Sequence, residues 1–391
     1  MKAAWQVKNL GDVCHLIGGG TPSKDNADFY TGNIPWATVR DMRSDVITDT
    51  EYKITESAIK NSSTNIIPSG SVIIATRVGL GKVCLLNQDT AINQDLRGIF
   101  PKDAEKLSTR FLFWWLKSVA HLIVAEGTGA TVQGVKLPFV KSLQIPLPPL
   151  PEQQRIVAIL DEAFEAIAAA RTNTEQNHQN ARNLFESYLQ SVFRQHGNGW
   201  VERSFSEVCE ISSTLVDPRQ DEYLEQLHIG GANIEAKTGK LLELRTAREE
   251  NLISGKFIFD ESMVLYSKIR PYLMKVVRPD FKGLCSADIY PLSPKSGLLD
   301  RNYLFHMLLS PQFTDYANAG SARAGMPKVN RGHLFSYRCF FPPIEQQIEF
   351  AASLDAIHEE TQCLESLYQR KIAALDELKQ SLLQQAFSGQ L

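Results

Sequence analysis

The residues of this chain with the clearest chemical use are cations and amides placed among glycines. Arg77-Val78-Gly79-Leu80-Gly81-Lys82 sets two cations around two glycines, and Asn93-Gln94-Asp95-Leu96-Arg97 groups two amides with an arginine. Amide side chains pair with adenine, and arginine pairs with guanine, in the major groove of DNA. These two segments predict contacts with double-stranded DNA.

Two more glycine-rich polar loops lie at 127–136 and 320–331, each just before a long helical region. Glycine lets the backbone approach phosphates, and nearby cations supply charge. The residues that we predict to bind DNA in these loops are Thr128, Thr131, Gln133 and Lys136, then Arg323, Lys328, Asn330 and Arg331.

A further basic cluster lies upstream of the second loop. Its cations are interleaved with Tyr266 and Tyr272, and they are Lys268, Arg270, Lys275 and Arg278. Any one of these cations, taken alone, is better explained as a solvated surface group. Their recurrence at matching places in both halves favours a binding role for the loops. The predicted DNA-binding set therefore includes Arg77, Lys82, Asn93, Gln94, Arg97, Lys268, Arg270 and Lys275.

Catalytic motifs are missing from the sequence. Gly79-Leu80-Gly81-Lys82 is not followed by the Ser or Thr of a phosphate-binding loop. No Asn-Pro-Pro-Tyr tetrapeptide of an adenine methyltransferase occurs, and Pro279-Asp280 has no Glu-x-Lys nearby to complete a nuclease site. The six cysteines and eight histidines follow no metal-ligand spacing. We expect no catalytic residue, no metal site and no cofactor in this chain.

The elements that must position these loops are duplicated. Glu152-Gln153-Gln154 and Glu345-Gln346-Gln347 both follow prolines and lie 193 residues apart (345 − 152). Proline suits the start of a helix, and a first-turn glutamate complements the helix dipole. Three further pairs of segments match in the same order, at offsets of 195, 191 and 192, and they are 10–14 with 205–209, 71–77 with 262–268, and 110–116 with 302–308. Such self-similarity predicts a repeated architecture.

Each long helical region carries a seam in steps of three and four residues. Seven of the ten seam positions in each are apolar, which predicts two helices of roughly 65 Å paired as an antiparallel coiled coil. The first seam comprises Leu160, Ala163, Ile167, Ala170, Thr174, Asn177, Ala181, Leu184, Tyr188 and Ser191. The second comprises Leu354, Ile357, Thr361, Leu364, Tyr368, Lys371, Leu375, Leu378, Leu382 and Gln385.

Composition is that of a globular protein, with 43% apolar and 22% charged residues in 391. The net charge of −3 makes any DNA contact a matter of local basic loops. No apolar run reaches the roughly 18 residues of a membrane span, and the N-terminus lacks a signal peptide's apolar core, so we expect a cytoplasmic protein. We predict the α/β (α+β) class, with globular domains at 1–148 and 199–341 and spacer helices at 149–198 and 342–391.

The chain resembles the DNA-specificity subunit of type I restriction-modification systems. The resemblance rests on the junction at 146–156, its echo at 342–347, the loop at 127–136 and the end at 384–391. It covers the whole chain and implies two target recognition domains, each reading half of an interrupted DNA site. Ile344 stands where the first junction has Pro151.

The resemblance also implies partners. Two methyltransferase subunits that methylate adenine would dock on the paired helices, and restriction (translocase-nuclease) subunits would join to cut DNA. S-adenosylmethionine, ATP and magnesium are then expected on those partners rather than on this chain.

Two other interpretations remain at this point. The chain could be the recognition module of a methyltransferase or nuclease of another type, although it carries no such catalytic motif. It could also be a coiled-coil scaffold without DNA affinity, which would leave the glycine-rich basic loops unexplained.

Overall fold

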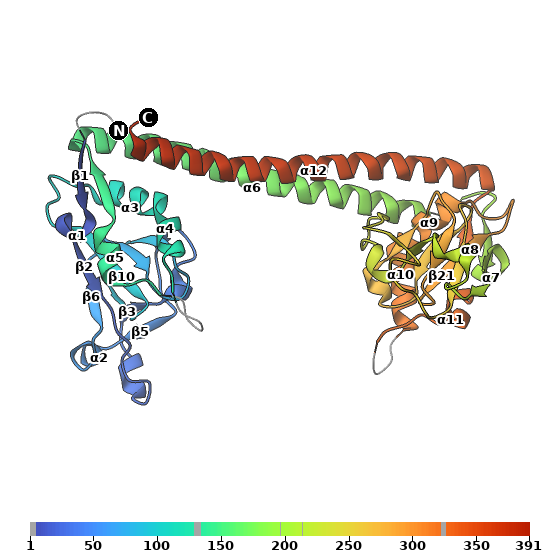
Figure 1. The fold of residues 1–391 in the computed structure, drawn as a ribbon, viewed down its shortest axis with the longest axis horizontal. Helices are drawn as coiled ribbons and strands as arrows, with labels where there is room; N and C mark the ends of the chain where they lie inside the picture. The colour runs from blue at the N-terminus through green and yellow to red at the C-terminus, as the bar shows by residue number, and fades with distance from the viewer. Residues whose placement is uncertain (1–4, 129–133, 196, 213, 322–325) are drawn as a thin grey trace. The chain divides into compact units, whose positions relative to one another are not determined.

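The computed structural model describes the chain except residues 1–4, 129–133, 196, 213 and 322–325. The chain divides into two compact units (Figure 1), unit 1 with residues 1–175 and 370–391 and unit 2 with residues 176–369. Each unit holds a globular part and portions of two helices of 45 residues, α6 (Leu150–Arg194) and α12 (Ile344–Ser388).

Unit 1 contains three sheets and short helices. The strand orders are β1-β11, β2-β10-β7-β8-β4 and β5-β3-β9-β6. The strands are β1 (Gln6–Asn9), β2 (Cys14–Gly18), β3 (Ile34–Ala37), β4 (Val46–Ile47), β5 (Tyr52–Ile54), β6 (Asn65–Ile67), β7 (Val72–Ala75), β8 (Val83–Leu86), β9 (Thr90–Ile92), β10 (Leu96–Pro101) and β11 (Gln144–Leu147). The helices are α1 (Leu10–Val13), η1 (Ala27–Tyr30), η2 (Val39–Asp41), α2 (Glu56–Lys60), α3 (Thr109–Ser118), α4 (Ala120–Ala125) and α5 (Leu137–Ser142).

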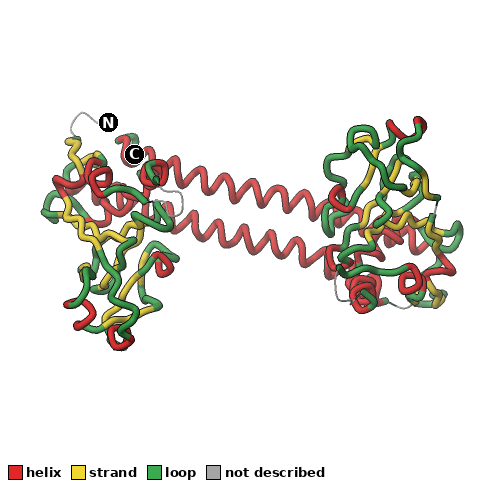
Figure 2. Tube along the Cα trace, turned by 60° about the horizontal axis from the view of Figure 1, so that its bottom comes forward, coloured by secondary structure: helices red, strands yellow, loops and turns green. Residues whose placement is uncertain are grey.

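Unit 2 is built in the same way (Figure 2), with strand orders β12-β22, β13-β21-β18-β19 and β14-β17-β20-β15-β16. The strands are β12 (Val201–Ser204), β13 (Cys209–Ile211), β14 (Leu215–Val216), β15 (Leu227–Ile229), β16 (Arg245–Thr246), β17 (Lys256–Phe259), β18 (Val264–Ser267), β19 (Val276–Val277), β20 (Gly283–Cys285), β21 (Ile289–Pro294) and β22 (Arg338–Phe341). The helices are α7 (Phe205–Val208), α8 (Asp221–Leu224), η3 (Gly231–Asn233), η4 (Pro271–Leu273), α9 (Arg301–Leu309), α10 (Pro311–Ala319) and α11 (Arg331–Phe335).

The predicted repeat is confirmed by topology. The order β2-β10-β7-β8 in unit 1 recurs as β13-β21-β18-β19 in unit 2. In each unit a two-stranded sheet also pairs the first strand with the strand just before a long helix, β1 with β11 and β12 with β22. Strand β7 begins at Val72 and β18 at Val264, an offset of 192. The segment match predicted at 191 is therefore shifted by one residue. The mixed α/β class with two repeats is correct.

Helix α3 shows why the sequence packs this way. Its residues 111–116 are all buried, and they share one apolar cluster with strands β7 and β8 and with both long helices. A helix that is apolar on all sides must lie inside the protein. Helix α9 is its counterpart in unit 2, with residues 303–309 buried.

One glutamine of each Glu-Gln-Gln motif makes hydrogen bonds at the start of another helix, which the role of the motif at a helix start did not predict. Gln153 is fully buried; its Oε1 accepts from Ser108 N (2.9 Å), and its Nε2 donates to the carbonyls of Lys106 (2.8 Å) and Pro148 (2.9 Å). In unit 2, Gln347 makes the same three bonds, accepting from Asp300 N (2.9 Å) and donating to the carbonyls of Leu298 (3.1 Å) and Pro342 (2.9 Å). Gln347 is the last residue of its triplet whereas Gln153 is the middle one, so the equivalent glutamines lie 194 residues apart (347 − 153) and the predicted offset of 193 is one residue short. Each glutamine thus joins the start of a long helix to the start of the buried helix beside it.

Within each unit the two long helices run antiparallel. In unit 1, Arg171 pairs with Asp376, while Arg155, sixteen residues earlier on α6, donates to the Leu391 carbonyl (2.8 Å), farther along the chain. In unit 2, Arg182 pairs with Glu365, and the rings of Phe185 and His358 lie 4.7 Å apart. The antiparallel pairing is as predicted.

The predicted seam of α6 is wrong in its last third. Leu184 is 65% exposed, and the buried residues there are Phe185, Leu189 and Val192. These three belong to the apolar cluster of the globular part of unit 2. The helix keeps its own period of about 3.6 residues and turns this face to the globular part, so a strict 3.5-residue seam drifts away from it. On α12 the seam likewise fails at Lys371, which is exposed, and at Leu378, which is 46% exposed.

Membrane insertion has no support among the described residues. None of their helices combines the length and the apolar character that a membrane crossing requires.

Candidate nucleic-acid interface

Three loops predicted to bind DNA meet in unit 1. Thr76 N and Arg77 N both donate to the Asp95 carbonyl (2.8 and 3.3 Å), and Val135 N donates to the Thr76 carbonyl (2.9 Å). Arg77 also forms an isolated β-bridge with Gly134. We call this meeting of the β7–β8 loop, the β9–β10 loop and the segment before α5 the three-loop junction.

Several predicted cations and polar groups around this junction face solvent. The Arg77 side chain is half exposed, with its Nε 3.8 Å from Asp95 Oδ1. Lys82, Thr128 and Lys136 are exposed. Long exposed cations can reach phosphates at little cost in lost internal bonds. Thr131 and Gln133 lie outside the described residues.

The two amides and the arginine predicted to read bases differ in whether their side chains are free to contact DNA. Asn93 is 6% exposed, and its side chain donates to Asp95 Oδ2 (3.0 Å) and accepts from Asp95 N (3.1 Å). It therefore shapes the loop. Arg97 donates to the carbonyls of Gln94 (3.2 Å) and Leu96 (2.8 Å); burial, together with the charge of Arg77, lowers its pKa. Gln94 is exposed and contacts Thr21, so it remains the best placed of the three for a base contact.

The three-loop junction recurs in unit 2. Lys268 N donates to the Asp288 carbonyl (3.0 Å), and Val329 N donates to the Lys268 carbonyl (2.9 Å). Ile269 forms the isolated β-bridge, here with Lys328. The predicted segments around Lys268 and Lys328 thus occupy positions equivalent to those around Arg77 and Gly134, whereas the loop of Asp288 was not predicted.

Two of the predicted lysines of unit 2 are turned inward. The Lys268 side chain is 12% exposed, lies 3.6 Å from Asp288 Oδ1 and sits 5.3 Å over the Tyr290 ring. Burial and then the charge of Lys328 lower its pKa. Lys275 Nζ donates to the Gly231 carbonyl (2.6 Å). Both lysines are held within the protein, because tertiary contacts offer them closer partners than solvent does.

The second glycine-rich loop keeps exposed cations. Lys328 and Arg331 are exposed, and Asn330 caps α11 by accepting from His333 N (2.7 Å). The side chain of Asn330 is thereby committed to starting a helix. Arg323 lies outside the described residues.

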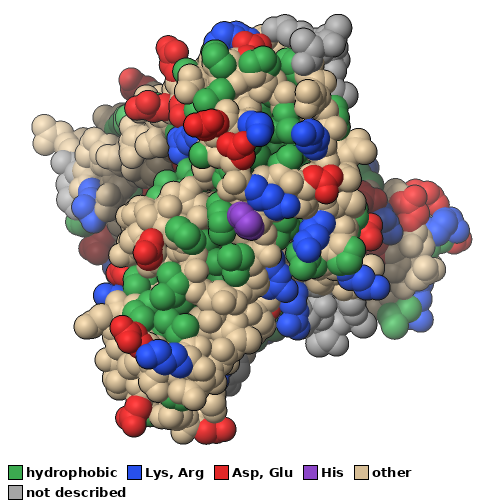
Figure 3. Space-filling view, turned by 90° about the vertical axis from the view of Figure 1, so that its left-hand side faces the viewer, with side chains coloured by type: hydrophobic (Ala, Val, Ile, Leu, Met, Phe, Trp, Pro, Cys, Tyr) green, Lys and Arg blue, Asp and Glu red, His purple; other side chains and the backbone are tan. Residues whose placement is uncertain are grey.

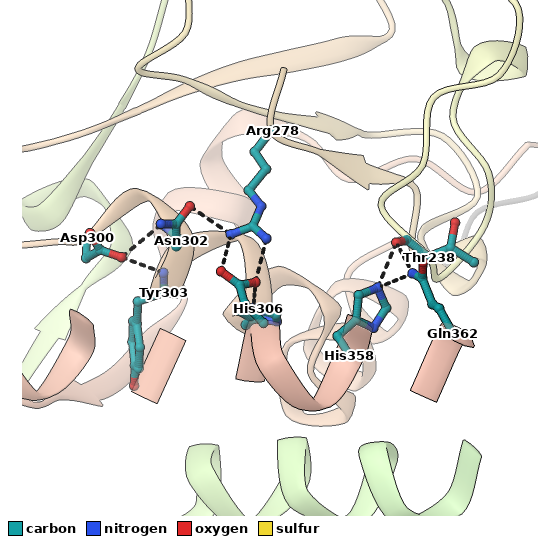
Figure 4. A network of polar contacts seen from close by, with 9 residues as sticks. Thr238, Arg278, Asp300, Asn302, Tyr303, His306, His358 and Gln362 are labelled. Atoms are coloured by element: carbon teal, nitrogen blue, oxygen red, sulfur yellow. Dashed lines mark hydrogen bonds and ion pairs between the residues drawn. The ribbon is translucent and has the colours of Figure 1, made fainter. Parts of the chain in front are cut away.

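The basic cluster predicted around Tyr266 is wrong at two further residues, Tyr266 and Arg278. Tyr266 is 1% exposed and packs in the core. Arg278 binds the Asp355 carboxylate through Nη1 (2.9 Å) and Nη2 (2.5 Å). It also donates to Asn302 (2.7 Å), and Figure 4 shows these two side chains pointing toward one another. Arg278 therefore fastens the globular part of unit 2 to α12. Tyr272, 49% exposed, remains at the surface.

A cavity of about 690 Å³ lies beside the three-loop junction of unit 1, and the sequence did not predict most of its lining residues. Its lining includes Val78, Gln94 and Asp95 from the predicted loops, joined by residues from four other segments, Thr21, Lys24, Tyr30, Trp36, Thr38, Val39, Arg40 and Tyr52. The one sequence signal nearby is Gly18-Gly19-Gly20. A side chain on Gly19 would meet the Ile92 carbonyl oxygen at 2.0 Å, so the glycines allow two backbones to approach.

The charge on the face of the molecule drawn in Figure 3 is mixed. Figure 3 shows Lys and Arg side chains among apolar and acidic ones, without a uniform basic surface. Local loops, rather than a broad field, must therefore supply any attraction to DNA.

Comparison with known proteins decides the family. The chain matches the model of the family described as "Type I restriction modification DNA specificity domain" twice, over residues 2–177 and 197–371. The chain belongs to this family. Its two repeats are accordingly two specificity domains, the first at 2–177 and the second at 197–371, and its role is in DNA sequence specificity.

Individual relatives are specificity subunits of type I restriction enzymes. The chain is 28% identical over 320 residues to the type I restriction enzyme EcoDI specificity subunit of Escherichia coli, covering 73% of this chain and 70% of the relative. It is 36% identical over 162 residues to the EcoR124I/EcoR124II specificity subunit of Escherichia coli, covering 40% of each.

Solved structures share the fold. A chain from a structure of the type I R-M system matches with a TM-score of 0.79 at 20% identity, covering 100% of this chain and 99% of that one. The HsdS subunit from Thermoanaerobacter tengcongensis matches with a TM-score of 0.62 at 20% identity, covering 100% and 98%.

Charge removal tests the loop of the second specificity domain. Replacing Arg323, Lys328 and Arg331 together with alanine is expected to weaken DNA binding at all sequences. Each lost phosphate contact should reduce the slope of log affinity against log salt by about 0.9, so by up to about 2.7 for three. Fluorescence anisotropy between low and high salt measures this slope.

The matched control removes three cations of the same domain that already pair with neighbouring acids. These are Arg219 with Asp217, Arg245 with Glu243, and Arg248 with Glu225. Alanine at these three positions should leave the slope unchanged. An equal loss of slope in both variants would mean that the loop at 320–331 has no special role.

Proposed function

We propose that this chain supplies the sequence specificity of a type I restriction-modification assembly, with each specificity domain reading one half of an interrupted target in double-stranded DNA. The observation that carries the proposal is the duplicated three-loop junction within two matches to one family. All three loops of the junction in unit 1, and two of the three in unit 2, carry residues that the sequence predicts to contact DNA.

We further propose that the two long helices present the docking surface for two methyltransferase subunits, which restriction subunits then join. The similar structure with a TM-score of 0.79 is one of complex assembly in a type I R-M system, which supports an assembly here too. S-adenosylmethionine, ATP and magnesium would be bound by those partners. The assembly would act in the cytoplasm.

In this proposal the chain performs no chemistry itself. The purified chain with DNA and S-adenosylmethionine should give no methyl transfer, whereas addition of its methyltransferase should give adenine methylation at one bipartite sequence. Incorporation of labelled methyl groups, followed by sequencing of the methylated sites, measures both.

Two results would contradict this proposal. Methyl transfer by the chain alone would make it an enzyme. Methylation by the partner at the same sequence in the absence of this chain would remove its role in specificity.

A further inference from the structure

One strained residue occupies the same place in both specificity domains. Val78 has φ 35° in the β7–β8 loop, and Arg270 has φ 51° and ψ 64° in the β18–β19 loop. The offset is that of the two strands, since 78 + 192 = 270. Among side chains at positive φ, a β-branched valine is a genuine outlier. Arg270 also precedes Pro271, which normally holds the preceding residue in an extended conformation.

Neither side chain has a packing reason to be there. Val78 is 51% exposed, and Arg270 is exposed. No described residue forms a hydrogen bond or ion pair with the Arg270 guanidinium. Glycine would adopt either conformation without strain, and the β7–β8 loop already uses it at Gly79 (φ 71°) and Gly81 (φ 82°).

The surrounding structure holds both residues in place. Arg270 N donates to the Pro327 carbonyl (2.9 Å), and Leu273 N donates to the Arg270 carbonyl (2.9 Å). In the first domain, the bridge between Arg77 and Gly134 fixes the residue just before Val78. Strain that is imposed by neighbours in this way is concentrated at functional sites.

The surroundings suit DNA. Val78 follows Arg77 in the chain and lines the cavity of about 690 Å³ together with the exposed Gln94. Arg270 is bonded through its backbone N to Pro327, the residue before the exposed Lys328. Arginine pairs with O6 and N7 of guanine, and small apolar groups contact the C5 methyl group of thymine. A rigid backbone that presents one exposed side chain is the geometry that base reading needs.

We propose that residues 78 and 270 are equivalent base-reading positions of the two specificity domains, with Arg270 pairing with a guanine and Val78 packing on the methyl group of a thymine. This inference rests on the proposed function. It also requires that the two bases lie in different halves of the target.

Modified bases in the target DNA test this proposal, with this chain assembled with the methyltransferase subunits. Once methylated sites have been sequenced, each guanine of the target is replaced in turn by 7-deazaguanine and each thymine by uracil. We expect one 7-deazaguanine to weaken binding by about tenfold or more for the unaltered protein and to have no effect on Arg270→Ala. Replacement of one thymine by uracil, in the other half-site, should likewise weaken binding of the unaltered protein and have no effect on Val78→Ala.

Two further sets of variants serve as controls. Arg270→Gly and Val78→Gly remove the side chains while suiting the positive φ, so they should repeat the alanine results in stably folded protein. Lys328→Ala should weaken binding to all these DNAs equally, as a phosphate contact does.

The inference is overturned if no base loses its effect in the variants, if both bases fall in one half-site, or if Arg270→Ala acts like Lys328→Ala. If the unaltered assembly has no sequence preference at all, the proposed function fails, and this inference fails with it.

Discussion

Replacing Asp355 with alanine is expected to lower the free energy of unfolding of unit 2 by about 3 kcal/mol, because removal of one partner leaves a poorly solvated charge behind. Asp355 accepts from Arg278 through two nitrogens and from His306 Nε2 (2.7 Å). His306 is fully buried, and without the carboxylate its ring would lose that bond. Arg278 would keep Asn302 and the Phe305 ring, 4.5 Å away.

The charge states of Asp355 and His306 make pH near 7 suitable for measuring this loss of stability. Burial raises the pKa of Asp355, but the hydrogen bonds from His306 and Arg278 outweigh it and hold that pKa at about 2. A depressed carboxyl pKa gives stability that is present above the unfolded value of about 4 and is lost as pH falls toward 2. Burial lowers the pKa of His306, so its ring is neutral at pH 7 and donates through Nε2.

Hydrogen exchange followed by mass spectrometry separates the two units in one full-length sample. A loss of about 3 kcal/mol corresponds to roughly a hundredfold faster exchange in α9 and β21. Peptides of α3 and β10, in unit 1, provide the internal reference.

Asp161 offers the matched variant in unit 1. It accepts from Trp114 Nε1 (2.7 Å) and Arg110 Nη2 (2.9 Å), the same arrangement in the first repeat. Its side chain and that of Arg110 are 36% and 42% exposed, so Asp161→Ala should cost only about 1 kcal/mol. Equal effects of the two alanine variants would show that burial of the ion pair is not what matters.

Local signals explain what the sequence could predict. Proline and a first-turn glutamate mark a helix start wherever the chain goes, so both long helices and the repeat were predictable from 152–154 and 345–347. The polar segments that carry cations predicted the three loops that meet in unit 1 and two of the three that meet in unit 2. These features depend on neighbours in the chain rather than on the fold.

Tertiary contacts explain what the sequence could not predict. Whether Lys275 points to solvent depends on the carbonyl of Gly231, 44 residues away in the chain, and whether Asn93 can reach a base depends on the shape of its own loop. The cavity in unit 1 is lined by residues from six segments of the chain, and no spacing in the sequence predicts it. The strained Val78 likewise follows a residue that is bridged to Gly134, 57 residues farther along the chain (134 − 77).

Helix length provides the last prediction, which concerns the gap between the half-sites. Helix α6 connects the globular parts of the two units. Arg171 of α6 pairs with Asp376 of α12 within unit 1, and Arg182 of α6 pairs with Glu365 of α12 within unit 2. Four residues inserted between Arg171 and Arg182 near Thr174, with four more inserted between Glu365 and Asp376, leave the pairs of each unit intact.

The insertion adds about 6 Å to each helix and rotates it by about 40° beyond a full turn. Since B-DNA rises about 3.4 Å per base pair, the half-sites should separate by about one to two more base pairs. Sequencing of methylated sites from cells that carry the lengthened chain and its methyltransferase measures the gap.

The half-site sequences themselves should stay the same, because both three-loop junctions are untouched. Insertion into α6 alone is the matched control; it shifts α6 against α12 and should lower methylation instead of yielding a clean new gap. An unchanged gap in the doubly lengthened chain would mean that the long helices do not set the spacing. A changed half-site sequence would mean that they also influence base reading, which the internal contacts of each unit argue against.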